Sequence, residues 1–87
     1  MKANKMKKNS QVRLKTFHGS LTSPNKVNKK EDYWVLIGEK GIVIDFADFN
    51  IEKVLVLFEK NLDDFNLENH NPIKNTLYID KLDLELY

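Results

Sequence analysis

Apolar side chains recur at every second position in each apolar segment of the chain. Near the C-terminus, Leu82, Leu84 and Leu86 alternate with Asp83 and Glu85. Side chains of an extended strand point alternately to the two faces of a sheet, whereas a surface helix repeats its apolar positions roughly every three to four residues. The alternation therefore predicts β-strands and favours no helix.

The alternation predicts five strands, near residues 12–17, 33–38, 42–47, 53–60 and 76–86. The fourth is apolar on both faces, which is typical of a central strand. In the last, the alternation changes phase near Asp80 and Lys81, so we expect a bulge or a tight turn at that point.

The length of the chain limits the fold that these strands can build. Eighty-seven residues allow one domain, and about 75 ordered residues are too few for a seven-stranded sandwich. We therefore predict an all-β, five-stranded, partly open barrel as a single domain over residues 12–87. Its expected core includes Trp34, Ile44, Val56 and Leu84.

Two glycines, Gly38 and Gly41, interrupt the apolar residues of "YWVLIGEKGIVID", residues 33–45. Glycine reaches positive φ at low steric cost, so we interpret this stretch as a tight hairpin with Glu39 and Lys40 at its tip.

This stretch also carries a resemblance to a known family. The Gly-x-x-Gly turn followed by "IVID", with "VLVLF" later in the chain, is similar to the glycine-turn-plus-strand hairpin of KOW-type barrels. Over most of residues 12–87 the pattern looks like that of the small SH3-like barrels of bacteria. The resemblance implies an SH3-like barrel, and its KOW-type members imply nucleic-acid binding.

Charge is divided unevenly along the chain. Residues 1–30 carry nine Lys or Arg and no acid, whereas residues 31–87 carry five Lys and thirteen acids, a net 5 − 13 = −8. Residues 1–11 offer few apolar side chains to offset the entropy of ordering them, so we predict a flexible basic tail there. A basic segment attracts acidic partners such as nucleic acid, whereas an acidic segment attracts basic ones, so this asymmetry allows either kind of partner.

The acidic part of the chain contains aromatic residues that directly follow aspartates. An exposed aromatic side chain surrounded by carboxylates can anchor a protein partner. We therefore predict a protein-binding module, more narrowly an acidic inhibitor of the immunity type that neutralises a basic, nuclease-like partner. We expect the candidate residues to form one acidic face; they are Asp45, Asp48, Phe49, Asp63, Asp64, Phe65 and Glu68.

An alternative prediction is nucleic-acid binding through the lysine-rich N-terminal region, where cationic side chains can follow a phosphate backbone. The candidate residues are Lys5, Lys7, Lys8, Arg13, Lys15, Lys29 and Lys30. A phage or accessory structural protein is a further alternative.

Residues that carry catalytic or metal chemistry are sparse. The chain has no cysteine, and its two histidines, His18 and His70, lie beside loop-forming residues without the spacing of a zinc motif. It has neither a phosphate-binding loop nor a nucleophile elbow. We therefore expect no enzymatic activity, no cofactor and no metal site.

No apolar run approaches the length of a membrane span, and no apolar segment follows the basic N-terminus as it does in a signal peptide. We expect a cytoplasmic protein without a membrane partner.

Overall fold

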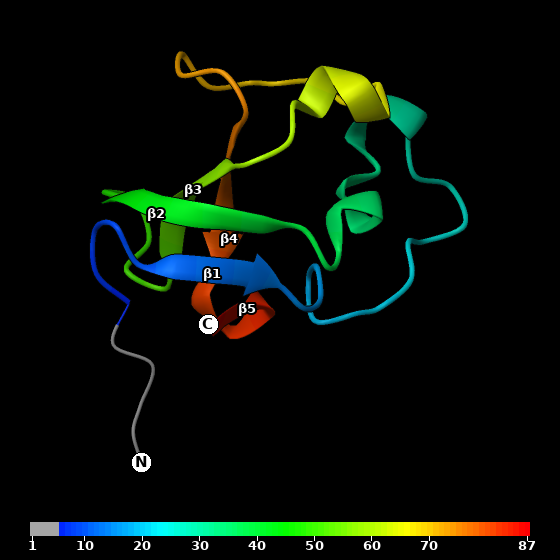
Figure 1. Cartoon of the computed structure of the whole chain (residues 1–87). Coiled ribbons are helices and arrows are strands. Elements are labelled where there is room, and N and C mark those ends of the chain that lie inside the picture. The colour runs from blue at the N-terminus through cyan, green and yellow to red at the C-terminus, as the bar shows by residue number, and fades with distance from the viewer. Residues whose placement is uncertain (1–5) are drawn as a thin grey trace.

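The computed structural model describes residues 6–87, in which five strands form one antiparallel sheet (Figure 1). The strands are β1 (Gln11–Leu14), β2 (Lys40–Phe46), β3 (Lys53–Phe58), β4 (Thr76–Asp80) and β5 (Leu84–Leu86). Their order is β4-β3-β2-β1-β5, and no hydrogen-bonded pairing joins β4 to β5 within residues 6–87. The prediction of a five-stranded β domain is confirmed, although hydrogen bonds do not close the sheet into a barrel.

Short 3-10 helices connect the strands: η1 (Lys29–Glu31), η2 (Tyr33–Leu36), η3 (Leu62–Phe65) and η4 (Lys81–Asp83). The strand predicted over residues 33–38 is therefore wrong, because η2 occupies that stretch. A 3-10 helix repeats every three residues, which places Tyr33 and Leu36 on the buried side and exposes Val35. Aromatic and β-branched residues favour strands, but here the burial of Tyr33 and Leu36 on one side of a 3-10 helix outweighs that preference.

The predicted glycine hairpin is also wrong. Gly38 does adopt a positive φ of 96°, but its N–H donates to the carbonyl of Leu14 at 2.7 Å instead of closing a hairpin. Gly41 lies inside β2, where an added Cβ would come within 2.7 Å of both the Leu57 carbonyl oxygen and a methyl group of Val56. It is therefore needed for close approach of β3.

A β-bulge between Val43 and Asp45 sets which side chains of β2 face the core. Val43 is fully buried, whereas Ile44 is half-buried, so the prediction of Ile44 in the core is wrong. Val56 and Leu84 are fully buried as predicted, and Trp34 is partly buried against the core. Residues 42–44 are all apolar, so the alternation does not indicate which of them point toward the core. The sequence therefore did not reveal the inward face of β2.

The phase change predicted near Asp80 and Lys81 is confirmed as a tight turn. The helix η4 separates β4 from β5 there, and Asp80 Oδ1 accepts a hydrogen bond from the Leu82 N–H at 2.9 Å. The extra residues of η4 leave Leu82 exposed and Leu84 buried.

The segment before β1 packs against the sheet from residue 6 onward. Met6 belongs to the buried core, the Asn9 N–H donates to the Val43 carbonyl at 2.6 Å, and the Val43 N–H donates to the Ser10 carbonyl at 2.9 Å. We expected a flexible tail over residues 1–11, but residues 6–11 pack against the sheet instead. Residues 1–5 of the expected tail lie outside the described residues.

Two long connections, residues 15–39 and 59–75, lie against each other beyond one end of the sheet (Figure 1). The Tyr33 hydroxyl donates to the carbonyl of Glu68 at 2.8 Å, and the Glu68 N–H donates to the carbonyl of Lys30 at the same distance. Leu62 and Leu67 are buried beneath them, so the core extends from the sheet under both connections.

Candidate functional site

The acidic and aromatic candidates fall into two groups at opposite ends of β3 (Figure 1). Asp45, Asp48 and Phe49 lie at the end of β2 and in the turn before β3, while the second group lies in and just after η3, which follows β3. A strand of six residues spans roughly 20 Å. The structure therefore does not bring the candidates into one acidic face.

Exposed apolar side chains gather around the first group. Phe49 is 68% exposed and Ile51 79% exposed, both in the turn between β2 and β3. The Phe49 ring meets the Tyr78 ring of β4 edge to face, with ring centroids 4.9 Å apart. Such contacts orient an aromatic side chain while leaving most of it in water.

The turn at the end of β4 lies directly beside this one. The Lys81 N–H donates to the carbonyl of Glu52 at 2.8 Å, and each of these residues adjoins an exposed apolar side chain. Leu82, next to Lys81, is 75% exposed. We call the surface formed by Phe49, Ile51, Tyr78 and Leu82 the turn surface.

Carboxylates outnumber cations around the turn surface. Residues 45–53 and 78–82 carry four acids and two lysines, and Lys8 beside Asp45 is a third cation, which gives a net 3 − 4 = −1. Asp45 Oδ1 lies 3.7 Å from the Lys8 ammonium, but both side chains are more than half exposed, so the pair is weak. The acidic side chains of this group are Asp45, Asp48, Glu52 and Asp80.

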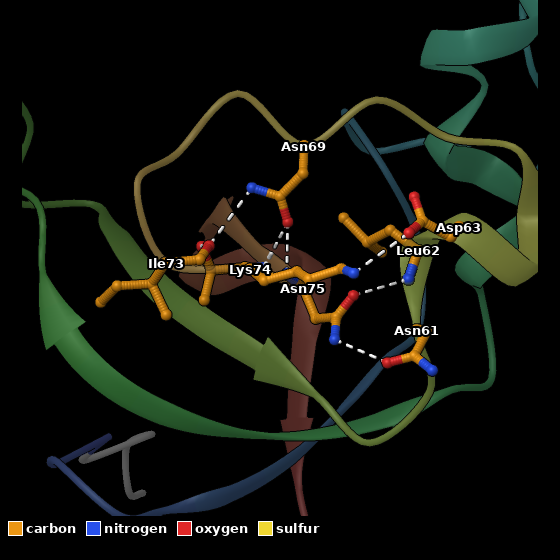
Figure 2. A network of polar contacts seen from close by, with 8 residues as sticks. Asn61, Leu62, Asp63, Asn69, Ile73, Lys74 and Asn75 are labelled. Carbon is orange, nitrogen blue, oxygen red and sulfur yellow. Dashed lines mark hydrogen bonds and ion pairs between the residues drawn. The ribbon is translucent and has the colours of Figure 1, made fainter.

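The second predicted group belongs to a loop held by asparagine side chains (Figure 2). Asn75, at φ +65°, accepts a hydrogen bond from the Leu62 N–H at 2.9 Å and donates to Asn61 at 2.8 Å. Asn69 Oδ1 accepts from the N–H groups of Asn75 and Thr76. These bonds fix the loop between β3 and β4.

Three members of the second group have structural partners. Asp63 lies 3.3 Å from the Lys74 ammonium, Phe65 packs against the core, and the backbone of Glu68 joins the two long connections. Asp64 is exposed. This group therefore presents less free apolar area than the turn surface.

The basic candidates are distributed over separate elements. Arg13 on β1 pairs with Glu85 at 2.8 Å, Lys8 pairs with Asp45, and Lys7 is exposed near the start of β1. Two further candidates, Lys29 and Lys30, lie on η1. Lys15 follows β1, and Lys5 lies outside the described residues.

A buried carboxylate at Asp83 was not identified from the sequence. Its side chain accepts hydrogen bonds from the Thr16 hydroxyl at 2.6 Å, the Gly19 N–H at 2.9 Å and the His18 N–H at 3.1 Å. In the sequence, Asp83 reads as an outward acid of an alternating strand. The only signal was the "HG" pair, because His18 and Gly19 both have positive φ and direct their N–H groups toward the carboxylate.

Within residues 6–87, no group of three or more His, Asp or Glu side chains is placed to hold a metal ion, and no pocket is present. No helix in this part of the chain is long and apolar enough to cross a membrane. No known protein family, curated protein or solved structure matches the chain.

Proposed function

We propose that the chain is a non-enzymatic protein-binding module that engages a basic partner through the turn surface. The observation that carries this proposal is the gathering of three large apolar side chains, Phe49, Ile51 and Leu82, each more than two-thirds exposed. Full burial of such a side chain by a partner contributes about 1.5–3 kcal/mol. Contiguous exposed apolar residues rimmed by polar ones are typical of protein-binding sites.

The charge around the turn surface supports a basic partner. Asp48 and Glu52 flank the apolar side chains of the turn, and acids outnumber lysines in the neighbouring residues 45–53 and 78–82. An acidic surface of this kind raises the association rate with a cationic protein and fixes its orientation. The role that fits is an acidic, immunity-type inhibitor that neutralises a nuclease-like protein in the cytoplasm.

We infer that the fold is a small, partly open barrel of the SH3-like type. Two observations support this inference. The last strand returns to pair with the first, and one buried cluster contains side chains from all five strands. A flat sheet cannot gather its two outer strands around one core, so the sheet must curve.

The proposal is tested with the purified product of the neighbouring gene, provided that this product is basic. Association and dissociation rates are measured by stopped-flow fluorescence at low and high salt. We expect D48K/E52K to lower the association rate and to weaken its salt dependence. F49A/I51S should raise the dissociation rate at least tenfold, because it removes apolar contacts.

The matched control is D63K/D64K, which reverses two exposed acids at the far end of β3. It should change the rates much less than D48K/E52K does. Equal effects of the two pairs, or rates insensitive to all these variants, would overturn the assignment of binding to the turn surface.

A further inference from the structure

The strand β4 lies at one edge of the sheet and pairs only with β3. The Phe58 N–H donates to the carbonyl of Asn75 at 3.0 Å, and the Lys81 N–H donates to that of Glu52 at 2.8 Å. In an antiparallel ladder, every second residue pair carries the hydrogen bonds. The register between these two bonds has no bulge, so the backbone groups of Thr76, Tyr78 and Asp80 point away from β3.

Asparagine side chains already occupy the first of these outward positions. The Thr76 N–H donates to Asn69 Oδ1 at 3.2 Å, and the Thr76 carbonyl accepts from Asn71 Nδ2 at 2.9 Å. Asn69 is itself held by its donation to the carbonyl of Ile73 at 3.2 Å (Figure 2). The two side-chain amides therefore replace a neighbouring strand at Thr76, which protects that part of the edge.

We infer that the uncovered edge of β4, at the N–H and carbonyl of Tyr78 and the N–H of Asp80, receives an extended segment of the basic partner as an added strand. This inference rests on the proposed function and deepens it. Within residues 6–87, no hydrogen bond engages the outward N–H or carbonyl of Tyr78. Strand addition satisfies such groups and supplies affinity through main-chain hydrogen bonds.

A second copy of the chain is a poor occupant of this edge. Antiparallel pairing of two β4 strands about Ile79 would set Tyr78 of each copy opposite Asp80 of the other. It would also bring the acids beside this edge, Asp48, Glu52 and Asp80, toward the same acids of the other copy, and like charges repel. A partner strand that starts opposite Tyr78 and continues past Asp80 avoids the asparagine loop.

The side chains beside the edge define the chemistry of the added strand. Asp80 accepts a hydrogen bond from the Leu82 N–H through Oδ1 only, which leaves its second oxygen for a cation. Lys or Arg opposite Asp80 would form a favourable cross-strand pair. Opposite Tyr78, whose ring contacts Phe49, an apolar residue fits. Because Tyr78 and Asp80 are two residues apart on one face of β4, the segment carries an apolar residue and a Lys or Arg separated by one residue.

The probe is the blocked peptide Thr-Arg-Thr-Arg-Thr-Val, in which Val can lie opposite Tyr78 and the preceding Arg opposite Asp80, with Thr-Glu-Thr-Glu-Thr-Val as the charge-reversed control. Affinity is measured by calorimetry, and amide protection by hydrogen exchange. We expect the basic peptide to bind and to slow hydrogen exchange at the Tyr78 and Asp80 amides, and the acidic peptide to do neither. No binding up to millimolar peptide, or binding without this protection, would overturn the inference.

Two variants separate the contribution of the Tyr78 N–H to peptide affinity from that of the Tyr78 ring. Y78A removes the ring, whereas Y78P removes the ring and the outward N–H without breaking a bond to β3, since proline is tolerated at such edge positions. We expect Y78P to bind the peptide about fivefold more weakly than Y78A. Slow exchange at Leu77 and Ile79 in both variants verifies that the ladder is intact.

Equal affinities of Y78A and Y78P would overturn strand addition and leave the proposed function standing, provided that F49A/I51S still weakens partner binding. Protection of Tyr78 that grows with protein concentration in the absence of peptide would identify a second copy as the occupant and overturn the inference. A peptide that protects Tyr78 but does not compete with the basic partner would also overturn the inference, because the partner would then not use this edge. Partner binding that is insensitive to F49A/I51S would instead count against the proposed function.

Discussion

Gly41 occupies a position without room for a side chain. In G41A, the new methyl group would lie 2.7 Å from a carbonyl oxygen of β3, and a backbone atom in a sheet cannot move aside cheaply. We expect G41A to lower the free energy of unfolding by about 2–3 kcal/mol, as measured by urea denaturation.

The control is Gly38, which has a φ of 96° and nothing within 4 Å of an added Cβ. Asn tolerates positive φ better than most non-glycine residues, so G38N should cost about 1 kcal/mol from backbone strain alone, which is less than the cost of G41A. A loss below about half a kcal/mol in G41A would show that β3 does not approach β2 as closely as described.

Asp83 is the one buried carboxylate among the described residues, and it accepts hydrogen bonds from three donors. D83N places an NH₂ group where an oxygen accepts, so at least one donor would face another donor. We expect a loss of about 1–3 kcal/mol in the free energy of unfolding. E85Q provides the comparison, because the Glu85–Arg13 pair is 42% exposed on each side and should contribute less than about 1 kcal/mol.

Tyr33 predicts how stability changes at alkaline pH. Burial, followed by the charges of Glu31 and Glu68, raises the pKa of its phenol above the ordinary value of 10.0. Above pH 10 the unfolded chain therefore ionises first while the folded protein keeps its proton. The stabilisation is present below that pH and is lost as the pH rises toward the folded-state pKa.

We expect the free energy of unfolding to fall more steeply above pH 10 in the wild type than in Y33F. Urea denaturation at several pH values measures both slopes. Between pH 7 and 9 the two proteins should differ by a constant amount, which reflects the lost hydrogen bond to Glu68. Parallel curves above pH 10 would contradict the assignment.

At the scale of elements, the connection between β3 and β4 depends on Asn75. Glycine accepts its φ of +65° but lacks the side chain that bonds Leu62 and Asn61. We expect N75G to cost about 1–2 kcal/mol from these hydrogen bonds. N75A should cost about 1 kcal/mol more, because alanine also strains the backbone. Urea denaturation of both variants, with hydrogen exchange at Leu62, measures the two contributions, and equal stabilities would argue against them.

The phase change near Asp80 and Lys81 predicted the turn at η4 correctly. The alternation of leucines with acids over residues 82–86 did not predict burial, because η4 exposes Leu82 and buries Asp83. In residues 33–37 every residue is apolar, so a strand and a 3-10 helix gave the same pattern. The bulge at Val43 escaped detection for the same reason, because its neighbours are also apolar.

At the scale of the whole molecule, the site was only partly predictable. Asp48 and Phe49 were found because they are adjacent in the sequence, but Tyr78 and Leu82 join them only through the register of β3 with β4. Sequence analysis also placed Asp63 in the same face. An antiparallel hairpin sends the two ends of β3 apart, and the charge pattern alone carries no information on that separation.

The pairing of the last strand with the first has a consequence for how the protein is made. Val12 pairs with Leu86, a sequence separation of 86 − 12 = 74 residues. Contacts this distant along a chain are costly to close and slow the folding of small β domains. During synthesis, β1 emerges from the ribosome first but waits for β5, the last strand to be translated. One edge of β1 therefore stays unpaired, and open to aggregation or chaperones, until β5 has cleared the exit tunnel.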